Sequence, residues 1–108
     1  MVCRSLERGE PPRQIIIQMT DNPNVDLLSC DLGDQTQVRQ LAHQLLERYH
    51  RIHVLLNNAG AWKAKRALTS DGIETIFAVN HLGSFLLSNL LKDRLIESAP
   101  SRIINVSS

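Results

Sequence analysis

The chain has little of several things that mark particular classes of protein. Its two cysteines, Cys3 and Cys30, are too few for a disulfide-rich secreted scaffold, and they suit a reducing compartment. No apolar run approaches the length of about 18 residues that a membrane-spanning helix needs. The N-terminus, MVCRSLERGE, is too polar for a secretory signal peptide.

The chain also lacks an excess of charge of either sign. Its 108 residues carry a formal net charge of +1, which gives no electrostatic reason to expect nucleic acid or an anionic membrane as a partner. The four histidines show none of the spacings of a zinc site, so no metal site is predicted. The length suits one small domain or part of a larger one.

Short apolar runs and helical stripes alternate along the middle of the chain. The run 25–30 lies between turn residues and predicts a strand. Asp34 and Gln37 have the spacing of a capping box, so a helix is expected to begin there and to end near His50. The next strand is expected at 53–57. The apolar stripe of the helix is Val38, Leu41, Ala42, Leu45, Leu46 and Tyr49.

A longer helix is expected in the second half of the chain. Ser70 or Asp71 can cap it, and the segment 73–97 is apolar on more than one side. Within this segment, Gly83 would let a neighbouring element approach closely. Another strand is expected at 102–106.

The first 24 residues are ambiguous when they are considered alone. Ile15, Ile16 and Ile17 favour a strand by β-propensity. Pro11 and Pro12 favour a helix that begins at the prolines, because proline is well tolerated in a first turn.

The alternation of strands and helices predicts an α/β fold with a parallel sheet and right-handed crossovers. Ligands of such sheets bind outside the carboxyl ends of the strands. Asp31, the turn 58–60 and the pair Ser107–Ser108 each follow an expected strand, so we expect them along one edge.

Several motifs follow one another along the chain. They are CRSLERGE, CDLGD, LLNNAG, VNHLG, NHLGSFLLSNLL, ESAPSRIINVSS and its end IINVSS. This ordered set resembles the short-chain dehydrogenase/reductase family, and more narrowly its retinol dehydrogenase branch. The resemblance implies a partial Rossmann-like doubly wound parallel sheet, with the first strand and the C-terminal part missing. Residues 1–108 would be the central part of a single NADP-binding domain, and 12–19 would be a helix.

The resemblance implies NADP as the cofactor and assigns residues to it. Arg4 would pair with the 2′-phosphate, for which a guanidinium fork is well suited. Asp31 would accept a hydrogen bond from the adenine amino group, with Leu32 beside the ring. Asn58, Ala59 and Gly60 would lie beside the ribose and adenine side. The alternatives are a solvated surface arginine at position 4 and an ordinary turn aspartate at position 31.

The resemblance also matches Asn80 and Ser108 to catalytic positions. Ser108 would hydrogen-bond the substrate oxygen, and Asn80 would help to hold a proton-relay water. The alternative for Asn80 is a polar residue that bends a helix, and the alternative for Ser108 is an exposed terminus. Asn57 would satisfy backbone groups of neighbouring strands, unless it is a plain turn residue. The family's Tyr-x-x-x-Lys is absent, and Tyr49 is interpreted as a core residue.

The implied function is hydride transfer between the nicotinamide of NADP and a small lipophilic alcohol or carbonyl, such as retinol or retinal. The 108 residues alone are expected to be inactive. The alternative is a non-catalytic truncated product that associates with an intact relative, and the resemblance allows a homodimer through the helix 73–97. Membrane association is expected only through segments missing here, at an intracellular location, cytoplasmic or on an intracellular membrane.

Overall fold

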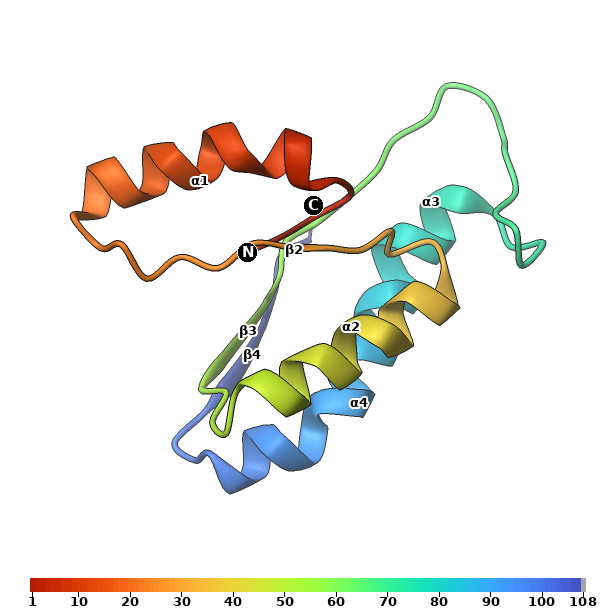
Figure 1. The fold of residues 1–108 in the computed structure, drawn as a ribbon. Coiled ribbons are helices and arrows are strands. Elements are labelled where there is room, and N and C mark those ends of the chain that lie inside the picture. Colours follow the sequence, from red (N-terminus) through yellow and green to blue (C-terminus); the bar gives the residue numbers. More distant parts are fainter. Residues whose placement is uncertain (108) are drawn as a thin grey trace. The chain divides into compact units, whose positions relative to one another are not determined.

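The computed structural model describes residues 1–107, in which strands and helices alternate as the sequence predicts (Figure 1). The chain forms two compact units, Met1–Asp31 and Leu32–Ser108. Each unit contains a two-stranded parallel sheet with a helical crossover between its strands. The α/β class with parallel strands is therefore confirmed.

The first unit consists of strand β1 (Val2–Cys3), helix α1 (Leu6–Thr20) and strand β2 (Leu28–Ser29). Val2 pairs with Leu28 and Cys3 with Ser29. The expected strand 25–30 is shorter in the structure, because β1 offers only two residues for it to pair with. Gly9 lies against Leu27 so closely that a Cβ on Gly9 would stand 2.6 Å from the leucine Cδ1.

Helix α1 settles the ambiguity of the first 24 residues. It includes the whole predicted helix 12–19, but it begins earlier, with Ser5 as the N-cap that accepts a hydrogen bond from the Arg8 amide at 3.2 Å. The prolines therefore lie in the second helical turn rather than the first. A proline there leaves the carbonyl four residues earlier without a helical partner. These carbonyls belong to Glu7 and Arg8, which are exposed, so water can solvate them.

The second unit begins with helix α2 (Gln35–Arg48), capped by Asp34 as predicted. The Asp34 carboxylate accepts hydrogen bonds from the amides of Thr36 at 2.9 Å and Gln37 at 3.3 Å. The Gln37 side chain returns to the Asp34 carboxylate at 3.1 Å, whereas a standard capping box would use the backbone amide of the cap.

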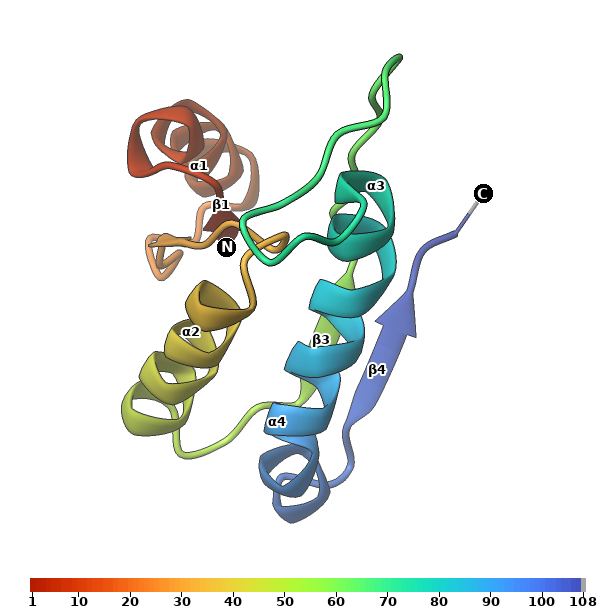
Figure 2. The ribbon, with the colours of Figure 1, turned by 90° about the vertical axis from the view of Figure 1, so that its right-hand side faces the viewer.

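Strands β3 (Val54–Asn57) and β4 (Arg102–Asn105) form the parallel sheet of this unit, from Val54 opposite Arg102 to Asn57 opposite Asn105. Figure 2 shows helix α4 (Ser84–Glu97) over the sheet and α2 beside α4. The core lies between the two helices, where apolar burial supplies the main stabilisation. Its buried side chains are Val38, Leu41, Ala42, Leu87, Leu91 and Leu95.

The predicted helix 73–97 is not continuous. Its first turn is α3 (Thr75–Phe77), followed by a π-helical turn, η1 (Ala78–Gly83), which leads directly into α4. The N-cap is Glu74 and neither Ser70 nor Asp71. The expected cap was wrong because Ser70 and Asp71 lie in a turn, which a hydrogen bond from the Gly72 amide to the Thr69 carbonyl closes at 2.9 Å. Among residues 1–107, no helix has the length and apolar character needed to cross a membrane.

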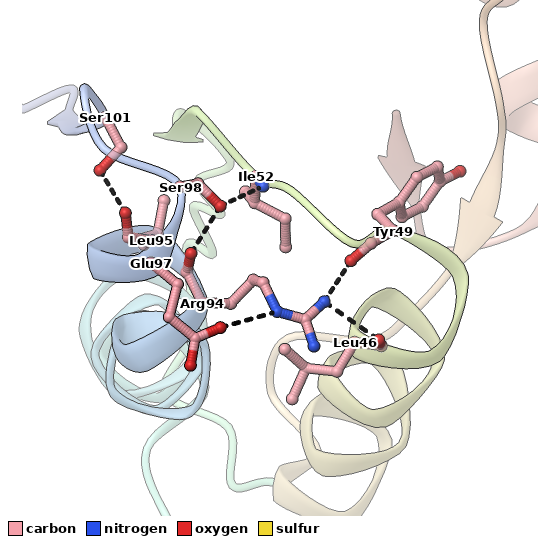
Figure 3. Close-up of polar contacts among 8 residues, drawn as sticks. All are labelled: Leu46, Tyr49, Ile52, Arg94, Leu95, Glu97, Ser98 and Ser101. Carbon is pink, nitrogen blue, oxygen red and sulfur yellow. Dashed lines mark hydrogen bonds and ion pairs between the residues drawn. The ribbon is translucent and has the colours of Figure 1, made fainter.

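A polar cluster fixes the connection between α2 and β3 (Figure 3). The Arg94 guanidinium on α4 donates hydrogen bonds to the carbonyls of Leu46, at 3.1 Å, and Tyr49. The Ser98 hydroxyl donates to the Arg94 carbonyl at 2.6 Å and accepts from the Ile52 amide at 2.9 Å. Because these contacts satisfy backbone groups at the end of α2, they hold the chain where it enters β3.

Candidate functional site

The carboxyl edge of the sheet in the second unit gathers several of the predicted site residues. The turn Asn58–Ala59–Gly60 leaves the end of β3, and residues 106–107 leave the end of β4. The strands are parallel and Asn57 lies opposite Asn105, so both segments emerge at the same edge. Ser108, the predicted catalytic serine, lies outside the described residues.

Asn57 joins three elements at this edge. Its Nδ2 donates hydrogen bonds to Asn105 Oδ1 at 2.9 Å and to Ser88 Oγ at 3.1 Å. The Nδ2 group therefore binds side chains of β4 and α4, which the sequence did not predict, and the expected contact with backbone groups stays a prediction. A plain turn residue would not make these contacts, so Asn57 fixes the end of β3.

Asn80 clamps the segment that follows Gly60. Its Oδ1 accepts a hydrogen bond from the Ala61 amide at 2.6 Å, and its Nδ2 donates to the Ala61 carbonyl at 2.9 Å. Asn80 lies in η1, and π-helical turns are frequent at functional sites. The side chain is therefore a positioning group for the turn 58–60, which is a role that the sequence did not predict.

Gly83, at the end of η1, brings the helix against the loop that contains Leu32. A Cβ on Gly83 would stand 2.5 Å from the Leu32 carbonyl oxygen. The expected close approach is confirmed, and the element that approaches is the segment after Asp31. Thus two residues of η1, Asn80 and Gly83, contact the segments next to the turn 58–60 and Asp31, which were predicted to bind the cofactor.

The first unit carries the other predicted cofactor residues, Arg4 and Asp31. They follow the paired strands β1 and β2, and the register continues with a hydrogen bond from the Cys30 amide to the Cys3 carbonyl at 2.9 Å. Arg4 and Asp31 therefore lie at one sheet edge. Arg4 is exposed and Asp31 is half-buried. The candidate residues thus form two sets, one in each unit.

Near the second set of candidate residues, the surroundings of Glu74 lower the pKa of its carboxyl group. Its carboxylate accepts hydrogen bonds from the amides of Phe77 at 2.8 Å and Ile76 at 3.1 Å. These bonds lower the pKa of Glu74 below its ordinary value of 4.5, and the charges of Arg66 and Lys63 lower it further. The carboxylate therefore remains charged and holds the start of α3.

Three contacts of this site were not predicted from the sequence. The Asn57–Asn105 pair had a visible signal, because both apolar strands end in asparagine. The contacts of Ser88 and Ala61 had no such signal in the sequence, because their partners lie 31 and 19 residues away.

Tyr49, predicted to be a core residue, is only half-buried, and its ring lies 5.8 Å from the Arg48 guanidinium carbon.

Comparisons with known proteins find similarity along the whole chain. A family model described as short chain dehydrogenase matches residues 1–108. The whole chain is 43% identical to retinol dehydrogenase 12 of Mus musculus and 44% identical to retinol dehydrogenase 13 of Homo sapiens. It spans 34% and 33% of these relatives, about a third of their length.

Solved structures share the fold. A metagenomic short-chain oxidoreductase in complex with NADP has a TM-score of 0.80 and 24% sequence identity, over 99% of this chain and 49% of that protein. At this level of identity, the similarity supports the α/β fold described above.

Proposed function

Because the chain belongs to the short-chain dehydrogenase family, we propose that it is the central part of an NADP-binding Rossmann-like domain in an oxidoreductase. The substrate is a lipophilic alcohol or carbonyl compound of the retinol and retinal class, the chemistry in the names of the two retinol dehydrogenases. The observation that carries the proposal is the turn 58–60 at the carboxyl edge of the sheet, held by the Asn80 clamp.

Within each unit, the candidate residues have the chemistry that a dinucleotide needs. Arg4 is exposed and can offer its guanidinium to the 2′-phosphate, which favours NADP over NAD. Asp31 and Leu32 serve the adenine ring. At Gly60, the atom nearest to an added Cβ is Asn80 Oδ1 at 3.7 Å, so there is room beside the Gly60 backbone for a ligand to approach.

The protein's own contribution is to bind and orient. The bound nicotinamide supplies the hydride chemistry. Ser108 would hydrogen-bond the substrate oxygen, and Asn80 would keep the backbone of Ala61 and the turn before it in place. The sequence has no Tyr-x-x-x-Lys, because its single tyrosine, Tyr49, is followed four residues later by His53. The 108 residues alone should therefore give no NADPH oxidation.

A chimera tests the enzyme function. Residues 1–108 replace the matching segment of retinol dehydrogenase 12 of Mus musculus, so that the parts beyond this chain are supplied. We expect NADPH-dependent reduction of retinal by the chimera. Arg4→Gln should raise the KM for NADPH about tenfold or more and leave that for NADH nearly unchanged, since a charged phosphate contact is lost. Arg8→Gln, on an exposed face of α1, is the matched control.

Two results would contradict the proposal. One is a chimera that folds and binds NADPH but reduces neither retinal nor other lipophilic carbonyls. The other is an equal effect of Arg4→Gln and Arg8→Gln on the KM for NADPH. Turnover by the 108 residues alone would contradict the prediction that they give no NADPH oxidation.

A second candidate function is association with an intact relative through the helical segment 73–97. The observation that favours it is a stack of exposed rings, with Phe77 and His81 centroids 5.3 Å apart and His81 and Phe85 centroids 6.0 Å apart. Analytical ultracentrifugation with full-length retinol dehydrogenase 12 tests it. A complex that Phe85→Ser weakens is expected, while Val54→Ser, an exposed apolar residue of β3, serves as the control.

A further inference from the structure

The loop between β3 and α3 carries an unusual combination of exposed side chains. We call residues 61–68, AWKAKRAL, the Trp62 loop. Trp62 is 81% exposed and Leu68 58% exposed, although large apolar side chains are normally covered. Lys63, Lys65 and Arg66 are exposed as well. The loop therefore presents an indole, an aliphatic side chain and three cations to its surroundings.

The Trp62 loop is held at both ends. At its start, Asn80 binds the amide and the carbonyl of Ala61. At its end, the Ala67 carbonyl accepts hydrogen bonds from the Thr75 amide at 2.9 Å and the Thr75 hydroxyl at 3.0 Å. Figures 1 and 2 both show the intervening segment, in green, projecting beyond α3 within its unit. The exposed side chains therefore project from a fixed base.

The cations of the loop lack ion-pair partners within the described chain. Among residues 1–107, none of Lys63, Lys65 and Arg66 takes part in a salt bridge, although Lys63 and Arg66 act on the Glu74 charge through space. No acidic residue occurs between Glu47 and Asp71. The net charge of +1 for the whole chain hides this local concentration of positive charge.

We propose that the Trp62 loop binds the surface of an anionic lipid bilayer. Tryptophan favours the headgroup level, where its ring is in apolar surroundings and its N–H can find a partner. Lysine and arginine extend their charged ends to lipid phosphates while their stems lie along apolar surface. The loop thus gives the chain a membrane contact of its own, independent of segments outside these 108 residues.

The combination favours a bilayer over a nucleic acid. A nucleic-acid surface would use several aromatic side chains for stacking and a longer basic track. Here a single tryptophan is followed within six residues by an exposed leucine, with the cations between them. Apolar and cationic groups in one short exposed segment match the boundary between lipid headgroups and acyl chains.

Tryptophan fluorescence of the purified chain tests the proposal, because Trp62 is its sole tryptophan. We expect a blue shift of the emission with vesicles of phosphatidylcholine and phosphatidylserine, a much smaller one with phosphatidylcholine alone, and reversal by salt. The triple variant K63Q/K65Q/R66Q should bind anionic vesicles about a hundredfold more weakly. R39Q/R51Q/K92Q makes the same charge change at exposed positions elsewhere and should bind nearly as the parent does.

Vesicle sedimentation of Trp62→Ser adds a measurement that needs no fluorescence, and the variant should bind several-fold more weakly. Circular dichroism confirms that each variant keeps the parent's helix content. The proposal is overturned if the emission is unchanged by anionic vesicles, or if the two triple variants lose binding equally. It is also overturned if a single-stranded oligonucleotide or glycerophosphoserine produces the shift and vesicles do not. No cofactor or substrate is used, so the result is independent of the enzyme proposal.

Discussion

At the scale of single residues, the Asn57 side chain is the clearest determinant of the sheet edge. Asn57→Ala removes hydrogen bonds to Asn105 and Ser88, so we expect a loss of about 1–2 kcal/mol in the free energy of unfolding. Urea denaturation measures it. In the control, Asn89→Ala, the lost bond is local to α4, to the Phe85 carbonyl, and alanine favours the helix. A loss as large in the control would remove the special role of Asn57.

Glu74 provides a prediction about pH. Its folded pKa lies below 4.5, so its contribution to stability is fully present above that value and is lost as the pH falls through the folded pKa. Glu74→Gln should therefore destabilise the chain at neutral pH, and this difference from the parent should shrink in acid. Urea titrations across that pH range test it. The control Glu97→Gln, whose ion pair with Arg94 spans 3.6 Å, should show little of this change.

At the scale of elements, the close packing of η1 on the Leu32 loop depends on Gly83. In Gly83→Ala the new Cβ would meet the Leu32 carbonyl, and we expect a net loss of about 1–3 kcal/mol even though alanine favours helices. Gly60→Ala meets its nearest atom at 3.7 Å and should cost far less in the same urea experiment. Equal losses in the free energy of unfolding of the two variants would show that the contact with Leu32 does not limit the packing.

The elements themselves were largely predictable, because their signals are local. The Asp34 cap and the parallel strands follow from short patterns of residues. The π-helical turn within 73–97 did not follow, because the apolar residues there fit ordinary helical periodicity. The earlier start of α1 was also missed, since the exposed carbonyls that tolerate Pro11 and Pro12 are a property of the folded surface.

At the scale of the whole molecule, burial is uneven. Helices α2 and α4 supply most of the buried apolar side chains, whereas Ile15, Ile16 and Met19 on α1 are exposed. Amides of α2 and α4 should therefore exchange with deuterium more slowly than those of α1, because exchange follows local opening. Hydrogen exchange measured by mass spectrometry tests this ordering. It would be wrong if peptides from α1 were protected as strongly as those from α4.

The candidate site was predictable only in part. The carboxyl edge of the sheet and the turn 58–60 follow from the strand order and the motifs. The Asn80 clamp on Ala61 did not, because a side-chain contact across 19 residues depends on how η1 is placed.

The π-helical turn gives the chain a place where its length can change. Such a turn holds an extra residue compared with an α-helix. Deletion of one residue from it, Val79 for example, would let η1 close into ordinary α-helix while α4 keeps its orientation around the helix axis. Leu87, Leu91 and Leu95 would still face the core. A deletion within α4 itself would instead rotate the residues after it by about 100°, so the segment 78–83 should tolerate the loss of one residue better than α4 does.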